Sequence, residues 1–214
     1  MKVASRKITL YVEGGGSGAH SGSLQAALRQ GFSDFFSKTA LGTQRRPKVV
    51  ACGGREQAFD RFKTALSAGE NALLLVDSED PVDKVAMPGD DKATWSPWAH
   101  LRQQAGWSKP EHAHDRDAHL MVQCMESWLL CDPHALKAFF GSGFKDLELK
   151  PASEKLTKRE LSDCLESATQ NTPKGRYNKG SHSFKLLALI DPAKVLHQSP
   201  WASRLLDELD GRRP

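Results

Sequence analysis

The sequence has few cysteines and no long apolar run, and these two absences exclude several classes of protein. Four cysteines occur among 214 residues, and no two of them form a CxxC pair. That spacing disfavours a disulfide framework or a zinc site and favours reduced thiols. No stretch approaches the roughly 20 apolar residues that cross a bilayer, and the first apolar run is too short for a signal peptide. We therefore expect a cytoplasmic protein without a membrane partner.

A strong excess of charge of either sign is also missing. The chain has 30 Lys and Arg against 26 Asp and Glu, which gives a formal net charge of +4. A charge of this size permits nucleic-acid binding but does not require it. The hydrophobic content of 39% is ordinary for a globular protein, and the length allows one full domain with a small appendage.

Hydrophobic patterning in the first half alternates between strands and helices. Apolar runs that predict strands are followed by segments with helical spacing of apolar residues. The expected strands are 7–13, 48–52, 72–77 and 119–124, and the expected helices between the first three are about 24–38 and 58–66. This order predicts an α/β fold with a parallel four-stranded sheet and helices on both faces.

The rest of the chain departs from this alternation. Residues 81–118 contain four prolines and three tryptophans and read as an insertion, with a short helix expected at 97–105. The last third is helical and rich in polar residues, and it includes a capping box from Thr157 to Glu160. We expect a main α/β domain over 1–140 and a helical C-terminal region over 141–214 packed on it.

Acidic residues follow two of the predicted strands. Glu13 ends the first apolar run, and Asp77, Glu79 and Asp80 end the third. In open α/β sheets, ligands bind outside the carboxyl ends of the strands. Carboxylate oxygens are the ligands that Mg²⁺ and Mn²⁺ prefer. This pattern indicates a divalent-metal site, whereas the alternative is that these acids are solvated turn residues or helix caps.

Four short motifs also resemble a known domain. They are Tyr11-Val12-Glu13-Gly14, Leu75-Val76-Asp77-Ser78-Glu79-Asp80, Met125-Glu126-Ser127-Trp128-Leu129-Leu130-Cys131-Asp132, and Tyr177-Asn178-Lys179-Gly180 followed by Ser183-Phe184. Together they resemble the Toprim domain of topoisomerases, primases and nucleases of the overcoming-lysogenization-defect class. The chain is most similar to a small stand-alone bacterial Toprim-like family of uncharacterised function. Members of that family often occur beside an ABC-type ATPase in presumed defence operons.

The resemblance implies roles for the acidic residues. Glu13 would bind metal or act in acid–base catalysis, and Asp77 would be a metal ligand. Glu79 stands where the Toprim pattern usually has aspartate, and Asp80 beside it is a further candidate ligand. Glu126 would belong to a second metal site or would simply cap its helix.

Basic residues near the C-terminal motif are candidates for binding phosphate. Lys179 is the preferred catalytic lysine, on the resemblance alone, and would stabilise developing negative charge. Lys174 and Arg176 lie in the same loop and are predicted to contact substrate phosphates.

The loop Gly14-Gly15-Gly16 lies directly after Glu13 and is interpreted as a place where a phosphate backbone approaches closely. A P-loop is disfavoured because no Gly-Lys-Ser/Thr follows. Gly14, Gly16 and Ala19 come close to a dinucleotide fingerprint. However, the second strand ends in Cys52-Gly53-Gly54 and offers no ribose-binding acid.

Two further groups have both a functional and a structural interpretation. His112, His114 and His119, with acidic residues between them, could bind a transition metal, although a solvated loop is the favoured explanation. The insertion's tryptophans could stack on bases or pack the insertion onto the domain. These three are Trp95, Trp98 and Trp107.

The function expected from this sequence is a Mg²⁺- or Mn²⁺-dependent nuclease, or nuclease-like effector, acting on DNA or RNA phosphodiesters. By the resemblance, it would act in bacterial defence with an ABC-type ATPase partner. A non-catalytic Toprim scaffold that binds and senses such an ATPase is the main alternative. A phosphatase or nucleotidyl transferase acting on a small substrate is the third.

Overall fold

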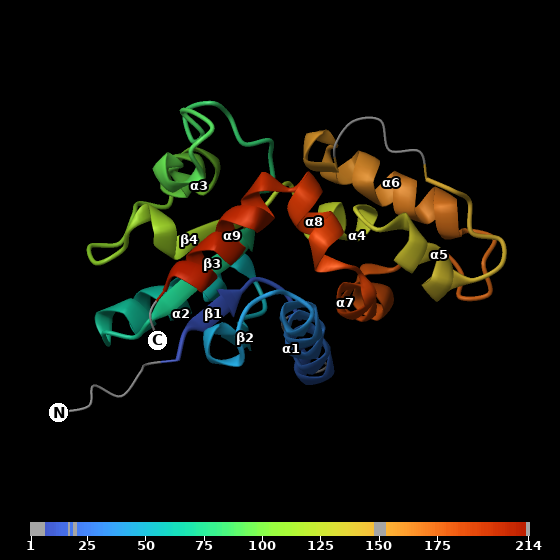
Figure 1. The fold of residues 1–214 in the computed structure, drawn as a ribbon, viewed down its shortest axis with the longest axis horizontal. Helices are drawn as coiled ribbons and strands as arrows, with labels where there is room; N and C mark the ends of the chain where they lie inside the picture. The colour runs from blue at the N-terminus through green and yellow to red at the C-terminus, as the bar shows by residue number, and fades with distance from the viewer. Residues whose placement is uncertain (1–6, 17, 19–20, 148–152, 213–214) are drawn as a thin grey trace.

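The protein has an α/β fold built on one parallel sheet (Figure 1). The computed structural model describes residues 7–16, 18, 21–147 and 153–212. Its strands are β1 (Thr9–Val12), β2 (Lys48–Ala51), β3 (Ala72–Asp77) and β4 (Ala118–Met121). They are all parallel, in the spatial order β2-β1-β3-β4. The predicted four-stranded parallel sheet flanked by helices is therefore confirmed, although β1 and β4 are shorter than expected.

Helices connect and cover these strands. In the first half they are α1 (Ser21–Ser37), α2 (Arg55–Ser67) and α3 (Pro97–Ala105), and α3 has the bounds predicted from the sequence. After β4 the chain is helical. The remaining α-helices are α4 (Glu126–Leu130), α5 (Pro133–Phe140), α6 (Lys158–Thr169), α7 (Lys179–Leu189), α8 (Pro192–Gln198) and α9 (Pro200–Gly211). Helix α7 begins at Lys179 because Asn178 acts as its N-cap.

The central strand β3 is apolar on both faces, which explains its unbroken run of hydrophobic residues. Leu73 and Leu75 join a hydrophobic core with α1 and the C-terminal helices. Leu74 and Val76 join a second core with α2 and α3. All four side chains are fully buried. The first core draws residues from both sides of the predicted boundary at residue 140.

Helix α7 is held against α1 in a close packing that positions its N-terminus. A Cβ at Gly31 of α1 would lie 2.6 Å from the carbonyl oxygen of Phe184, so this approach requires glycine. Lys38 donates hydrogen bonds from Nζ to the carbonyl oxygens of Ala188 (2.9 Å) and Ile190 (2.5 Å) at the other end of α7. The packing brings the first residues of α7 to the carboxyl ends of the strands.

Helix α9 protects the edge strand β4. Buried Arg204 donates hydrogen bonds to the carbonyl oxygens of Ala118 (2.8 Å) and Asp115 (2.7 Å). Its guanidinium also contacts the ring of His119 at 3.2 Å. This helix thereby satisfies backbone groups at a sheet edge that would otherwise be open to pairing with another chain.

The burial of the tryptophans shows whether they are available to stack on bases, and the surroundings of the histidines show whether they could bind a metal. Trp95, Trp98 and Trp107 are only 4–6% exposed and belong to the second core. They pack the insertion on the sheet, so stacking on bases is not their role in this structure. His119 is fully buried. Among the described residues, the histidines belong to no group suited to a metal ion.

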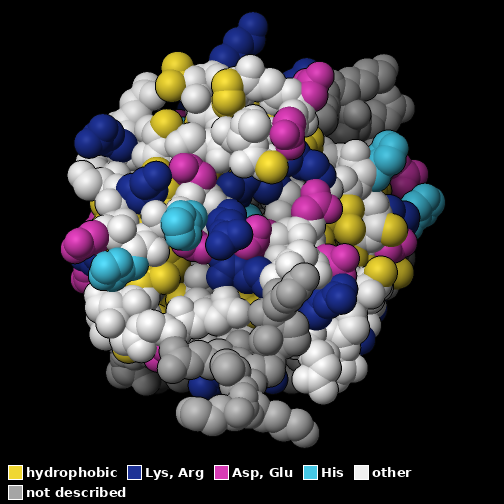
Figure 2. Space-filling model, turned by 60° about the vertical axis from the view of Figure 1, so that its left-hand side comes forward, with side chains coloured by type: hydrophobic (Ala, Val, Ile, Leu, Met, Phe, Trp, Pro, Cys, Tyr) yellow, Lys and Arg dark blue, Asp and Glu magenta, His cyan; other side chains and the backbone are white. Residues whose placement is uncertain are grey.

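The surface and the cysteines are unexceptional. The four cysteines are free thiols, and three of them are buried. Within the described ranges, no helix combines the length and apolar character that crossing a membrane requires. On the face shown in Figure 2, Lys and Arg side chains gather near the centre among acidic and histidine side chains.

Candidate metal centre

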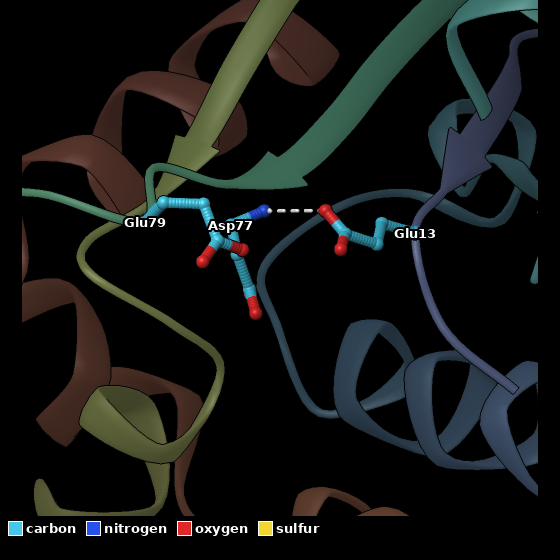
Figure 3. Close-up of side chains that lie close together, drawn as sticks. All are labelled: Glu13, Asp77 and Glu79. Atoms are coloured by element: carbon cyan, nitrogen blue, oxygen red, sulfur yellow. Dashed lines mark hydrogen bonds between the residues drawn. The ribbon is translucent and has the colours of Figure 1, made fainter. Parts of the chain in front are cut away.

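Three carboxylates meet where β1 and β3 end. Glu13 follows β1, Asp77 is the last residue of β3, and Glu79 lies two residues farther on. Each offers an oxygen, and these oxygens lie within 4.8 Å of one another (Figure 3). The backbone N–H of Asp77 donates a hydrogen bond to Oε2 of Glu13 at 3.3 Å. The cluster forms because β1 and β3 are parallel neighbours, so their carboxyl ends share one edge of the sheet.

Asp77 is held rigidly within this cluster. Its carboxylate is buried, and Oδ1 accepts a hydrogen bond from the backbone N–H of Met125 at 3.1 Å. Its carbonyl oxygen accepts a second one from Nη1 of Arg55 at 2.9 Å. The other carboxylate oxygen, Oδ2, lies 3.6 Å from Lys158 Nζ and 3.7 Å from Lys179 Nζ.

Glu79 has a strained backbone. Its φ of +68° is the only positive value among the non-glycine residues that the structure describes. Hydrogen bonds from Ser78 N to Met121 O and from Glu79 N to Gln123 O fix this turn beside β4. A left-handed conformation at a residue with a long side chain costs about 1–3 kcal/mol, and such residues gather at functional sites.

Cationic side chains from three helices surround the cluster. Lys158 of α6 contacts Glu79 at 2.5 Å, and Arg55 of α2 lies 3.6 Å from the same carboxylate. Lys179 of α7 lies 3.4 Å from Glu126 as well as close to Asp77. Each of the two lysines therefore lies between two carboxylates: Lys158 between Asp77 and Glu79, and Lys179 between Asp77 and Glu126.

The acids in the cluster have raised pKa values. Burial and then the neighbouring Asp77 charge raise the pKa of Glu13 to about 7, against the opposing effect of Arg55. Burial raises the pKa of Asp77 to about 6, although Lys179 and Lys158 act in the other direction. The carboxylates raise the pKa of both lysines, which outweighs the lowering effect of burial. Perturbed acids in one cluster are a common property of functional sites.

The donor set fits a hard divalent cation. Glu13, Asp77 and Glu79 supply carboxylate oxygens only, which suits Mg²⁺ or Mn²⁺ rather than a soft transition metal. A bound cation would also relieve the repulsion that burial intensifies between these acids. Within the described part of the chain, this is the only such group of three residues.

Two other predicted ligands lie outside this group. Asp80 is exposed, and the cluster's third carboxylate is that of Glu79. Glu126 is buried on α4 and accepts a hydrogen bond from the Tyr177 hydroxyl at 2.9 Å. Burial raises the pKa of Glu126, but the charge of Lys179 and the Tyr177 hydrogen bond outweigh it and lower the pKa overall. Glu126 is thus an ionised partner of Lys179.

The glycine loop borders the cluster. Gly14, Gly15 and Gly16 have φ values of +128°, +87° and +67°, and a Cβ at Gly14 would lie 2.6 Å from Leu28. All three line a cavity of about 280 Å³ together with Glu13, Asp77 and Lys179. Ala19, the last position of the dinucleotide-like pattern, lies outside the described residues.

The remaining predicted phosphate contacts are not in the cluster. Lys174 is exposed and its ammonium stacks over the ring of Phe139, 5.0 Å from the centroid. Arg176 is also exposed. Neither residue lines the cavity beside the carboxylates.

Sequence reasoning missed Arg55 and Lys158. Arg55 follows Gly53-Gly54 at the end of β2, so the same rule that identified Glu13 and Asp77 could have identified it. Lys158 is the first residue of α6, and no local pattern distinguishes it from other surface lysines. Its place beside Glu79 arises from tertiary packing.

No curated protein and no solved structure matches this chain. One family does match, over residues 12–210, a span that contains every carboxylate and cation of the site. The chain therefore belongs to the DUF4276 family, a domain of unknown function.

Proposed function

We propose that this protein is a Mg²⁺- or Mn²⁺-dependent phosphodiesterase that cleaves nucleic acid. The observation that carries the proposal is the cluster of Glu13, Asp77 and Glu79, whose oxygens lie within 4.8 Å of one another at the carboxyl edge of a parallel sheet. Lys158 and Lys179 beside it supply positive charge for a phosphate. Carboxylates that bind a cation, next to lysines that bind an anion, suit a phosphodiester.

The bound cation would supply Lewis-acid activation of the phosphodiester. The Glu13 carboxylate, ionised beside the bound cation, would take a proton from the attacking water. The water oxygen bonds to phosphorus while the bond from phosphorus to the leaving oxygen breaks. Lys179 is half-exposed at the cavity and would hold the negative charge that develops on a phosphoryl oxygen. Asp77 and Glu79 would hold the cation.

The sequence resemblance to Toprim nucleases agrees with this proposal and extends it. It supports DNA or RNA as the substrate and a defence function exercised together with an ABC-type ATPase. The lysines are supplied by helices of the C-terminal region, so this region would be part of the catalytic unit.

Hydrolysis of labelled oligonucleotides tests the proposal. With Mn²⁺, the wild-type protein should cleave single-stranded or duplex DNA or RNA, and EDTA should stop cleavage. Glu13→Gln should slow hydrolysis by about 100-fold or more, because general-base catalysis contributes about 10²–10⁴-fold. Lys179→Met should also reduce the rate strongly.

Matched surface variants control for changes in folding. Glu111 is exposed in a turn, and Lys137 forms an exposed ion pair with Asp146. Glu111→Gln and Lys137→Met should hydrolyse substrate like the wild type. Hydrolysis that persists at the wild-type rate in Glu13→Gln and Lys179→Met would refute the proposed mechanism.

One observation favours a second function, that of a non-catalytic scaffold for a partner ATPase. Lys158 and Lys179 already pair with Asp77, Glu79 and Glu126, so the carboxylates are partly neutralised by the chain itself. A scaffold would keep its effect in cells when the acids are lost. An Asp77→Asn strain that retains full biological activity would favour it over the enzyme.

A further inference from the structure

A small apolar cavity lies directly beside the acidic cluster. Its volume is about 280 Å³. Glu13, Asp77 and Lys179 form its polar side, and the rest of its lining consists of glycines and apolar side chains. The apolar members are Leu24, Met121, Met125 and Phe184, and the glycines are Gly14, Gly15, Gly16, Gly53 and Gly180.

The size of this cavity limits what it can hold. Ligand pockets in proteins typically have volumes of about 300–1,000 Å³, and the volume of this cavity, about 280 Å³, is just below that range. It accommodates a single nucleoside-sized group and not a segment of stacked base pairs.

The walls of the cavity suit a flat aromatic ring. Met121 and Met125 present thioethers, which make favourable contacts with aromatic rings. Phe184 offers a ring on α7 for stacking, and stacking on aromatic side chains tolerates any base. Gly14, Gly15 and Gly16 complete the lining with backbone alone, because a Cβ at Gly14 or Gly15 would collide with Leu28 or Gln25.

We infer that this cavity binds one unpaired nucleoside of the substrate, next to the phosphate that the acidic cluster and Lys179 address. This inference rests on the proposed function and narrows its substrate class. The site therefore acts on single-stranded nucleic acid, or on nucleotides that have left a duplex. A base within an intact duplex reaches such a pocket only if it is flipped out of the stack, which costs unstacking and unpairing energy.

Gly180 offers a way to fill the cavity without touching the acids. It is an exposed helical residue of α7 that lines the cavity, and a Cβ there would meet only Asn178 Oδ1 at 3.4 Å. Gly180→Ala and Gly180→Leu therefore reduce the cavity in two steps. Gly211→Leu is the matched control, because Gly211 ends α9 in open space.

Binding is measured by fluorescence anisotropy in EDTA, where no metal-dependent hydrolysis occurs. The probes are labelled hexathymidylate and a labelled blunt 12-base-pair duplex. Wild type and Gly211→Leu should bind hexathymidylate at least 10-fold more tightly than the duplex. Gly180→Ala should weaken hexathymidylate binding moderately and Gly180→Leu by at least 10-fold, while thermal unfolding shows that both variants are folded.

Two results would overturn the inference. One is duplex binding as tight as single-strand binding by the wild type, and the other is unchanged hexathymidylate binding by a folded Gly180→Leu variant. Either result leaves the proposed function standing, since Mn²⁺-dependent hydrolysis is measured separately. Loss of hydrolysis alone, with selective binding retained, would refute the phosphodiesterase and not the nucleoside pocket.

Discussion

Two buried aspartates, Asp77 and Asp132, have opposite electrostatic properties although both follow apolar segments. Asp132 accepts hydrogen bonds from the backbone N–H groups of Ala135 and Asp191 and from Lys194 Nζ at 2.6 Å. Burial raises its pKa, but these hydrogen bonds, that of Lys194 first among them, outweigh it and lower the pKa overall. Asp77 is also buried, and burial raises its pKa to about 6.

The difference lies first in the deeper burial of the Asp77 carboxyl group, which is the largest cause of its raised pKa, and then in the partners that offset burial in each case. Asp132 is an N-cap whose partners are one ammonium and two amides. At Asp77 the charges of Glu126 and Glu79 add to the effect of burial, so its two lysines at 3.6 and 3.7 Å do not compensate fully. A carboxylate whose charge is fully stabilised by hydrogen bonds and cations of the protein has a structural role. A cluster of carboxylates whose negative charge the protein stabilises only in part is suited to bind a cation.

The largest expected effect is on the rate of hydrolysis, which should fall when Asp77 is substituted but not when Asp132 is. Asp77→Asn keeps the size of the side chain but removes a charge from the proposed cation site. It should therefore reduce Mn²⁺-dependent hydrolysis by about 100-fold or more, since loss even of a residue that only orients a metal ligand typically costs about 10–100-fold. Asp132→Asn should remain within about twofold of the wild type when both are assayed well below their unfolding temperatures. Equal losses of hydrolytic rate in the two variants would contradict the assignment of Asp77 to the cation site and of Asp132 to a structural role.

The expected losses of stability have the opposite order, with a larger loss at Asp132 than at Asp77. Asp132→Ala removes a helix cap and the partner of Lys194, and we expect it to lower the free energy of unfolding by about 2 kcal/mol. Asp77→Asn should cost less, because it also relieves repulsion from Glu13 and Glu79. Urea unfolding at pH 7.5 in EDTA measures both values. A greater loss for Asp77→Asn would contradict the comparison.

The pH dependence of stability should also distinguish the two regions. The pKa of Glu13 rises from an ordinary value near 4.5 to about 7 on folding, so the folded state keeps a proton that the unfolded state loses. The metal-free protein should therefore lose about 2 kcal/mol of stability as the pH rises from about 5 to 8. Glu13→Gln should flatten this slope, and Asp132→Ala should leave it unchanged over the same pH range. A wild-type stability that rises between pH 5 and 8 would be inconsistent with these assignments.

The smallest effect concerns the strained turn. Asparagine tolerates the left-handed conformation better than glutamate does. Glu79→Asn should therefore raise the free energy of unfolding in EDTA by up to about 1 kcal/mol, while it weakens Mn²⁺ binding. Glu111→Asn serves as the matched exposed control. A destabilised Glu79→Asn variant would show that the ion pairs with Lys158 and Arg55 outweigh the strain.

Local rules were sufficient to predict the strands and the acids that follow them. Glu13, Asp77 and Glu79 could be predicted because parallel strands place their carboxyl ends at one edge of the sheet. The short helix predicted at 97–105 also has these bounds in the structure, as α3. The resemblance to Toprim domains stays a prediction.

Contacts across the fold could not be read from local pattern. Lys158 reaches Glu79 only because α6 packs beside α4, and Arg55 reaches Asp77 from the helix after β2. Conversely, Asp80 shares the sequence motif of Asp77 and Glu79 but is exposed, because the turn at Glu79 redirects the chain. Side-chain direction after a strand depends on such turns and not on spacing alone.

The central claim is that Glu13, Asp77 and Glu79 form a cation site, and calorimetric titration with Mn²⁺ at pH 7.5 tests it most directly. The account predicts saturable binding by the wild type and by Asp132→Asn, accompanied by release of the fraction of a proton that Glu13, with a pKa of about 7, still holds at this pH. Asp77→Asn should lose this binding. Binding that is unchanged in Asp77→Asn, or absent from the wild type, would contradict the account.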